Sequence, residues 1–455
     1  MNLKEILKFA AEQNVEFIDL KMTDLLGRLH HLSLPYSETT MKKLTTEGVG
    51  FDGSSYGFQR VENSDMIMKP DLATALVDAF REARTLSFFT RVYNTDKEDT
   101  PYQFDLRNMA EATEKLLSKY NIADKSMWGP EFEFYVLSNV EFNSSAEDSY
   151  YYIESAQEFS GNGYHIANPQ DSFDDFRDEA TKLLMQAGIS VKYHHHEVGS
   201  LGQQEIETNF DRLLQTADKI ILTKYLLHNL AAQKNLRLTF MPKPVFRQAG
   251  SGLHVHHYLM QNGDNAFYEK GKYANLNQTA MYYIGGVLKH APALSAFTNP
   301  TTNSYKRLVP GVEAPTAINF GQANRASCVR IPRYIRDAEK TRFEYRPPDA
   351  TANPYLMLSA IMMAGIDGII NKIDPVKEGF GPYEADEYDP SIEIKYLPFS
   401  LVTALQALKD DHEFLLRDNI FSPGLIDHWI KVKHKEFTDI SNWPSPIEYT
   451  MYFEF

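Results

Sequence analysis

Hydrophobic residues recur along the chain with two different periods. Apolar positions three and four residues apart predict helices over residues 2–13, 36–48, 105–120, 173–187, 210–234, 276–290 and 353–371. Alternating apolar and polar residues predict strands, first over 18–22 and again within 72–93, where Ala75, Val77 and Ala79 alternate. The start of the chain is therefore expected to be mostly β, whereas the remainder alternates long helices with further strand-like segments.

This change of pattern predicts two domains. The first 95 or so residues suit a small, mostly β domain with one or two helices, and the polar stretch from Asn94 to Pro101 suits a linker. A chain of 455 residues is long enough for one large domain plus a smaller one. The segment 299–315 is rich in Pro and Asn, so we expect a long loop without regular structure there.

Four strand-like segments share one plan: 131–134, 203–207, 254–257 and 342–346. In the first, Glu131 and Glu133 alternate with Phe132 and Phe134, so both carboxylates lie on one face of the predicted strand. Any one such segment is more often a solvated face over a core. The agreement of four, with Glu, His and Arg mixed, favours a polar functional cleft along one sheet.

The residue types in this cleft indicate a chemistry. Clustered carboxylates with a histidine favour hard divalent cations such as Mg²⁺ or Mn²⁺, and arginines beside them favour phosphate oxygens. Together they suit phosphoryl transfer. The sequence has neither a Walker-type phosphate loop nor a Gly-x-Gly-x-x-Gly turn before a helix. Zinc at His194, His195 and His196 is disfavoured, because adjacent strand residues point to opposite faces.

Composition narrows the possible partners. The net charge is 46 − 61 = −15, which argues against general nucleic-acid binding and against an anionic membrane surface. Cys328 is the single cysteine, so no intramolecular disulfide is possible; we expect a packing role for it and a reducing compartment. The N-terminus has no signal-peptide pattern, and no apolar run approaches a membrane span, so we expect a cytoplasmic protein.

Several motifs, in order and over nearly the whole length, resemble type I glutamine synthetase. The most specific is the run 299–315, Asn-Pro-Thr-Thr-Asn-Ser-Tyr-Lys-Arg-Leu-Val-Pro-Gly-Val-Glu-Ala-Pro. The others are Phe51-Asp-Gly-Ser-Ser55, Gly129-Pro-Glu-Phe-Glu-Phe134, His194-His-His-Glu-Val198, Gly202-Gln-Gln-Glu205, Phe240-Met-Pro-Lys-Pro244, Gly250-Ser-Gly-Leu-His254, Asn324-Arg-Ala-Ser327, Arg330-Ile-Pro332 and Asn353-Pro-Tyr355.

The resemblance implies an α+β fold: a small N-terminal β-grasp-like domain over 1–98, then a catalytic domain over 99–455 with a curved antiparallel sheet flanked by helices. It implies that ammonia is joined to the γ-carboxyl of L-glutamate through γ-glutamyl phosphate, with ATP as donor and two or more Mg²⁺ or Mn²⁺ ions. It also implies a homo-oligomer, a dodecamer of two stacked hexamers with active sites between subunits.

By the same resemblance, each site residue has an expected role. Two sets of three would bind metal: Glu133, Glu197 and Glu205, and then Glu131, His254 and Glu344. Glutamate and the transferred phosphoryl group would meet Gly250, Arg307, Arg325, Arg330, Arg342 and Arg346. The nucleotide would be bordered by Thr208, Phe210 and His256, with Arg330 and Arg342. Ammonium would meet Asp52 as proton acceptor, with Ser55 and Tyr164 beside it, and Glu313 would close the site against water.

A few positions depart from the family pattern. Ala249 stands where the commoner form has Asn, and Val312 replaces an aromatic residue. Lys192 replaces an acidic residue near the expected ribose. These departures leave open a γ-glutamyl–amine ligase, which would use a primary amine or polyamine in place of ammonia, although Asp52 argues against it. A catalytically silent homologue is a further alternative, which the full set of carboxylates and arginines disfavours.

Overall fold

The computed structural model describes the chain except residues 57–63, 97–98, 158–160, 311–313 and 385–392. Within the described part, six strands form the sheet of the N-terminal domain, in the order β2-β1-β6-β4-β3 with β5 on β6. They are β1 Phe17–Thr23, β2 Leu29–Pro35, β3 Val49–Asp52, β4 Asp65–Pro70, β5 Leu76–Val77 and β6 Thr85–Asn94. The β1–β6 pair is parallel and the other pairs are antiparallel.

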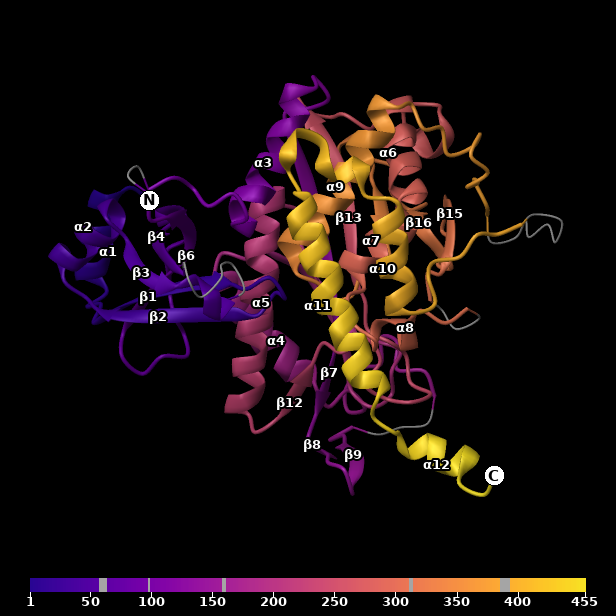
Figure 1. Cartoon of the computed structure of the whole chain (residues 1–455), viewed down its shortest axis with the longest axis horizontal. Helices are drawn as coiled ribbons and strands as arrows, with labels where there is room; N and C mark the ends of the chain where they lie inside the picture. Colours follow the sequence, from indigo (N-terminus) through magenta and orange to yellow (C-terminus); the bar gives the residue numbers. More distant parts are fainter. Residues whose placement is uncertain (57–63, 97–98, 158–160, 311–313, 385–392) are drawn as a thin grey trace.

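Two helices, α1 (Leu3–Glu12) and α2 (Glu38–Thr46), accompany this sheet at the indigo end of Figure 1. α1 begins at Asn2 because its side chain and that of Glu5 satisfy each other's backbone N–H groups. Ile6 and Ala10 of α1 are fully buried in a core shared with Ile18 and Leu20 of β1. The strands expected within 72–93 are confirmed in part, since β6 begins at Thr85, but the alternation from Ala75 to Ala79 does not form one strand. Asp71 caps a 3₁₀ turn at Leu72–Thr74, and only Leu76–Val77 pair as β5.

A second sheet carries the large domain. Its strands are β7 Lys125–Leu137, β10 Val191–His196, β11 Gln203–Thr208, β12 Arg237–Thr239, β13 Leu253–Gln261, β14 Asp264–Asn265, β15 Ala317–Gln322, β16 Ser327–Ile331 and β17 Phe343–Tyr345. The order is β10-β11-β7-β13-β17-β16-β15, antiparallel throughout except for β15–β16. The four segments with the shared plan lie on β11, β7, β13 and β17, so the expectation of one polar sheet face is confirmed.

Helices cover the apolar face of this sheet. α9 (Pro354–Ile370) lies at their centre and is buried along nearly its whole length. Around it pack α3 Leu106–Lys119, α5 Leu213–Gln233, α6 Gln278–Lys289 and α7 Ala291–Thr298, while α10 Leu401–Asp410 and α11 Pro423–Ser441 pack outside α7. α4 (Asp174–Gln186) packs against β10. Phe132 and Phe134, fully buried, point into this core, which leaves Glu131 and Glu133 on the opposite face.

Asn353 joins the two domains. Its side-chain oxygen caps α9 at Tyr355, and its amide nitrogen donates to the backbone oxygens of Asp24 and Leu25, each at 3.1 Å. Asp24 and Leu25 belong to the turn between β1 and β2. Gly27 in that turn has φ +85°, and a Cβ there would lie 3.1 Å from Cα of Asn353.

Two features project from the body in Figure 1: the hairpin of β8 (Asn139–Ser144) and β9 (Ser149–Glu154), and the C-terminal helix α12 (Pro446–Tyr452). The loop expected over 299–315 contains one helical turn, α8 (Ser304–Arg307), because Thr301 and Ser304 bond each other's backbone N–H groups. Among the described residues, no helix is long and apolar enough to span a membrane.

Candidate active site

The register of four neighbouring strands brings acidic residues together on the open face of the large sheet. Glu133 on β7 pairs directly with Glu205 on β11, and Glu131 on β7 pairs with His254 on β13. Side chains opposite each other on one face are close neighbours. Two groups result, each with its ligand atoms within 4.8 Å of one another and each buried: Glu133, Glu197 and Glu205, and Glu131, His254 and Glu344.

The first group consists of carboxylates alone, and its electrostatics favour a bound cation. Burial, together with the nearby carboxylates of Glu133 and Glu205, raises the pKa of Glu197 to about 8. Burial and four other carboxylates likewise raise the pKa of Glu205 well above its usual range. Three acid groups held this close fit a hard divalent cation, which supplies the missing positive charge.

The second group has its own positive partners. Burial opposes ionisation of Glu131, but His256 and His254 outweigh it and hold the pKa of Glu131 well below its usual range. Burial likewise opposes ionisation of Glu344, yet Arg346 and other neighbours outweigh it and lower the pKa of Glu344 to about 2. Both carboxylates therefore remain charged, ready to bind a metal ion or to hold the arginines in place.

Arg307 lies over the loop that precedes β13. Its Nη2 is 3.3 Å from Nε2 of His254, and its Nη1 donates to the backbone oxygen of Pro347 at 2.7 Å. A Cβ on Gly250 would come within 2.7 Å of the Arg307 side chain, and one on Gly252 would come within 2.5 Å of Nη2. Glycine at these two positions therefore leaves the space in which the guanidinium lies.

Other arginines line the same face. Arg330 and Arg346 each donate to a different oxygen of Glu344, and Nε of Arg346 donates to the backbone oxygen of Arg325 at 3.2 Å. Arg342 lies over the ring of Phe210, 5.4 Å from its centroid. The result is a positive rim beside a negative centre.

Phe210 and Thr208 occupy the margin of the cleft next to β13. Phe210 packs on Gly129, where a Cβ would lie 3.1 Å from the ring, and its centroid is 6.4 Å from that of His256. Thr208 is buried, and its hydroxyl donates to the backbone oxygen of Pro130 at 3.4 Å. His256 Nε2 lies 2.7 Å from Oε1 of Glu131.

Within one chain, Asp52 and Ser55 do not join these groups. Asp52 ends β3 in the N-terminal domain, and Figure 1 shows that strand well apart from β13. Hydrogen bonds from the Ser54 and Ser55 side chains lower the pKa of the exposed Asp52 to about 2. Tyr164, by contrast, is on the large domain, where it interacts with Arg325 and with Glu197. Glu313 and Val312 lie outside the described residues.

The three consecutive histidines have separate partners. His194 Nε2 lies 3.2 Å from Asp178, and His195 Nε2 lies 3.3 Å from Oε1 of Glu205. His196 is buried with Nε2 2.8 Å from Gln157. This arrangement agrees with the argument that the three do not converge on one ion.

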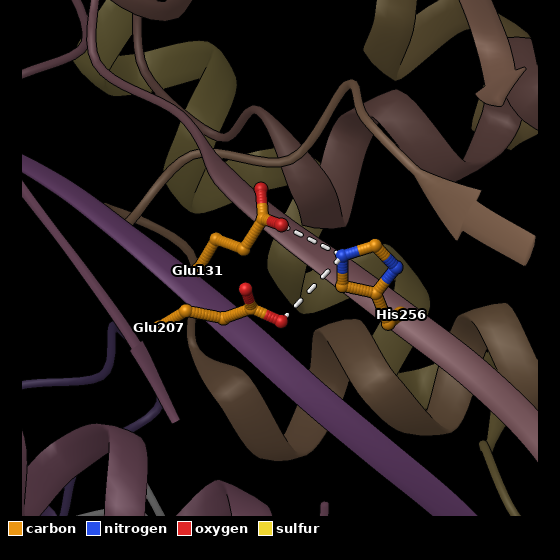
Figure 2. A group of neighbouring side chains, drawn as sticks. All are labelled: Glu131, Glu207 and His256. Carbon is orange, nitrogen blue, oxygen red and sulfur yellow. Dashed lines mark hydrogen bonds and ion pairs between the residues drawn. The ribbon is translucent and has the colours of Figure 1, made fainter. Parts of the chain in front are cut away.

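Two contributions to the site were missed by the sequence reasoning. The backbone N–H of Gly252 donates to Oε2 of Glu133 at 2.7 Å, a contact without any side-chain signal. Glu207 lies beside Glu131 and His256, as Figure 2 shows, and these three form another group with ligand atoms within 4.8 Å. Here a signal existed, because Glu207 follows Glu205 by two residues and so shares its strand face.

The chain matches two models of one protein family. The family model described as "Glutamine synthetase, catalytic domain" matches residues 103–452, and "Glutamine synthetase, beta-Grasp domain" matches 14–95. A protein named glutamine synthetase from Streptomyces coelicolor is 42% identical and covers 100% of this chain and 99% of its own length. One of the same name from Frankia alni is 40% identical and covers 99% of both chains. The Aquifex aeolicus relative with the same name is 40% identical over 99% of this chain and 98% of its own.

Solved structures of related proteins have the same fold as this chain. The cryo-EM structure of Plasmodium falciparum glutamine synthetase superposes with a TM-score of 0.90 at 27% identity, covering 99% of both chains. A structure titled "Apo GmaS without ligand" gives a TM-score of 0.84 at 27% identity, covering 98% of this chain and 99% of that one.

Proposed function

This chain belongs to the glutamine synthetase family and is a glutamate–ammonia ligase, and we propose that its catalytic centre is the pair of buried acidic groups on β7, β11, β13 and β17. The observation that carries the proposal is the register that places Glu133 against Glu205 and Glu131 against His254. The matches to the family models and to a solved structure confirm the family and the α+β fold expected from the sequence. The division between the domains at residue 98 remains our proposal.

We assign Glu133, Glu197 and Glu205 to one divalent cation and Glu131, His254 and Glu344 to a second. Bound Mg²⁺ or Mn²⁺ supplies positive charge to the phosphate oxygens of ATP. The donor sets fit this role, since the raised pKa values of Glu197 and Glu205 report carboxylates that lack a counter-charge. Gly252 N–H and Arg307 fix the directions of Glu133 and His254.

The reaction has two displacements. An oxygen of the glutamate γ-carboxylate forms a bond to the terminal phosphorus of ATP, and the bond from that phosphorus to the bridging oxygen of ADP breaks. Ammonia then bonds to the carbonyl carbon of the γ-carboxyl group and loses a proton, and inorganic phosphate leaves with the electron pair of the broken C–O bond. Arg325 and Arg330 would neutralise the transferring phosphoryl group, while Arg307, Arg346 and the open backbone at Gly250 would bind glutamate.

The nucleotide would lie along the margin formed by Phe210, Thr208 and His256. Phe210 and Arg342 form a stacked pair there, a flat apolar surface with a positive charge on it. Such a surface suits a purine ring and the phosphates that follow it. His256 lies between this margin and Glu131, which connects the nucleotide to the second acidic group.

Ammonium requires an anion, and Asp52 supplies one. Its pKa of about 2 keeps it charged at neutral pH, so it attracts NH₄⁺. We assign to it the proton that must leave before nitrogen can attack, a step that requires the pKa of Asp52 to be higher in the assembled site. Because Asp52 and Ser55 lie apart from Tyr164 and Arg325 within one chain, we propose that they complete the site of a neighbouring subunit. A dodecamer of two stacked hexamers provides this arrangement. Glu313 would close the site against water.

Phosphate release from ATP and glutamate in the presence of Mg²⁺ or Mn²⁺ tests this function. It should depend on ammonium, with methylamine and polyamines giving far slower turnover. Release that ignores ammonium would overturn the assignment. Faster turnover with an amine would favour the γ-glutamyl–amine ligase that Ala249 left open.

A further inference from the structure

Arg307 is a buried cation that is held by neutral groups. Its guanidinium donates to three successive backbone oxygens, those of Arg346, Pro347 and Pro348, at 3.2, 2.7 and 3.4 Å. The residue is only 8% exposed, and no carboxylate of the described residues forms an ion pair with it. The protein therefore leaves the charge of this guanidinium for a ligand, and a carboxylate is the ligand that fits its planar fork.

The three carbonyls belong to a stiff turn directly after β17. Proline fixes φ near −65° and has no N–H, so Pro347 and Pro348 restrict the turn and offer acceptors alone. The turn is also tied to its neighbours. The backbone N–H of Arg346 donates to the oxygen of Cys328 at 2.9 Å, and that of Leu253 donates to the oxygen of Pro348 at 2.8 Å. The place of the guanidinium thus depends on where the middle carbonyl of the row lies.

Asn299 holds that middle carbonyl. It ends α7, where the proline that follows it stops the helix, and its side chain is fully buried. Nδ2 donates to the oxygen of Pro347 at 2.7 Å and to Oδ2 of Asp349 at 3.1 Å, while Oδ1 accepts from the Thr298 hydroxyl at 2.8 Å. Both N–H groups and the oxygen of the amide are used, which fixes its orientation.

We propose that Asn299 is a positioning residue for glutamate binding, because its amide holds the Pro347 carbonyl where Arg307 bonds it, and that Thr298 orients this amide. The oxygen of Pro347 accepts from both side chains, each at 2.7 Å, so a shift of one displaces the other. The inference rests on the proposed function, in which Arg307 binds glutamate. Since Asn299 acts through this carbonyl, its effect is confined to glutamate and does not extend to ATP.

Initial rates of phosphate release, with glutamate and ATP varied in turn, test the role of Asn299. Asn299→Leu should raise KM for glutamate roughly fivefold to tenfold, as expected for one lost hydrogen bond, and leave KM for ATP unchanged. Thr298→Val keeps the shape of its side chain and should raise KM for glutamate about twofold to threefold. The double variant should equal Asn299→Leu, because the amide through which Thr298 acts is gone.

Asn277→Leu is the matched control. The Asn277 amide also donates to a backbone oxygen, that of Ala266 at 2.8 Å, and its Oδ1 caps α6. Its contacts in the described part of the chain include neither Arg307 nor the turn after β17, so neither KM should change. A general folding defect lowers the fraction of active enzyme, and with it kcat, without raising KM for one substrate.

Unchanged KM for glutamate in Thr298→Val and Asn299→Leu, an equal rise in KM for ATP, or additive effects in the double variant would each overturn the positioning role. If Asn299→Leu does not fold, Thr298→Val decides alone, and an unchanged KM for glutamate in it overturns the role.

Isothermal titration calorimetry with glutamate, on the same samples with Mg²⁺ and ADP, needs no turnover. Weaker glutamate binding in Asn299→Leu, in a protein whose native form shows no ammonium-dependent release, would reject the proposed function and keep the positioning role. Ammonium-dependent release by the native protein, with equal KM for glutamate in all variants, would reject the positioning role alone.

Discussion

Nη2 of Arg307 lies 3.3 Å from Nε2 of His254, and both atoms lie beside Gly252. A Cβ added to Gly252 would be 2.5 Å from Nη2 of Arg307 and 2.7 Å from Nε2 of His254. Arg307 and His254 come from separate parts of the chain, α8 and β13, and a glycine makes room for their contact. Because a guanidinium only donates, Nε2 of His254 is the acceptor and Nδ1 faces Glu131.

Gly252→Ala should therefore reduce activity strongly. The methyl group would displace Arg307 or His254, and misplacing such groups by an ångström lowers kcat by roughly a hundredfold. Steady-state kinetics with the melting temperature measured alongside would show this. Gly424→Ala is the control, since the nearest atom to its added Cβ is 3.9 Å away, and it should leave kcat unchanged. Equal activity in both variants would refute the positioning argument.

Metal-free protein should lose stability as pH rises. The folded-state pKa of Glu197 is about 8, above the ordinary value of 4.5, so the folded protein binds more protons than the unfolded chain between these values. Stability is fully present below pH 4.5 and declines up to about pH 8, by a few kcal/mol at most. Thermal melts with EDTA at pH 5 and pH 8 measure the loss. Glu197→Gln should reduce the difference between the two melts without abolishing it, because the pKa of Glu205 is raised as well, and saturating Mn²⁺ should reduce it for the native protein.

Hybrid oligomers should test where Asp52 acts. Asp52→Ala and Arg325→Ala should each reduce glutamine formation at least a hundredfold, since each removes a charge from the reacting centre. If the two residues meet only between subunits, co-assembled mixtures of both variants should regain part of the native rate. Mixtures of two separately inactive Arg325→Ala preparations provide the baseline. No recovery in the mixed sample would mean that Asp52 serves its own chain.

Arg342→Gln should raise KM for ATP by roughly tenfold and leave KM for glutamate nearly unchanged. The guanidinium lies over Phe210 on the nucleotide margin and bonds no member of either acidic group. Initial rates with each substrate varied in turn separate the two constants. Arg336→Gln, on the exposed loop of the same region, is the matched control and should alter neither. A larger change in KM for glutamate than in KM for ATP would show that Arg342 binds glutamate and not the nucleotide.

Alternation along single strands was enough to predict the composition of the acidic face. Glu131 and Glu133 had to share a side because strand side chains repeat every two residues. Which strands became neighbours was not contained in that pattern, because register depends on long-range packing. The grouping of Glu133 with Glu205 was therefore expected from the family resemblance and not from the strand pattern, whereas the N–H of Gly252, which has no side chain, was found only in the structure.

Other features depended on local competition that composition does not show. Ala75 to Ala79 alternates like a strand, yet the side chain of Asp71 stabilises a 3₁₀ turn before it. The segment 299–315 contains α8 despite its prolines, because Thr301 and Ser304 satisfy the first N–H groups. Glu207 was overlooked although the period that selected Glu205 also selects it.

Asn353 gives the molecule a mechanical property. One amide closes the first turn of the most buried helix and holds the β1–β2 turn of the small domain. Arg107 on α3 also donates to Asp71, and Tyr225 on α5 donates to Asp78, so several contacts together set the direction in which the small domain leaves the large one. Asp52 lies on another strand of that domain, so the contacts that hold the small domain also fix where Asp52 lies relative to the large one. In an assembled ring, the core of one subunit would thus aim the acid that its neighbour uses.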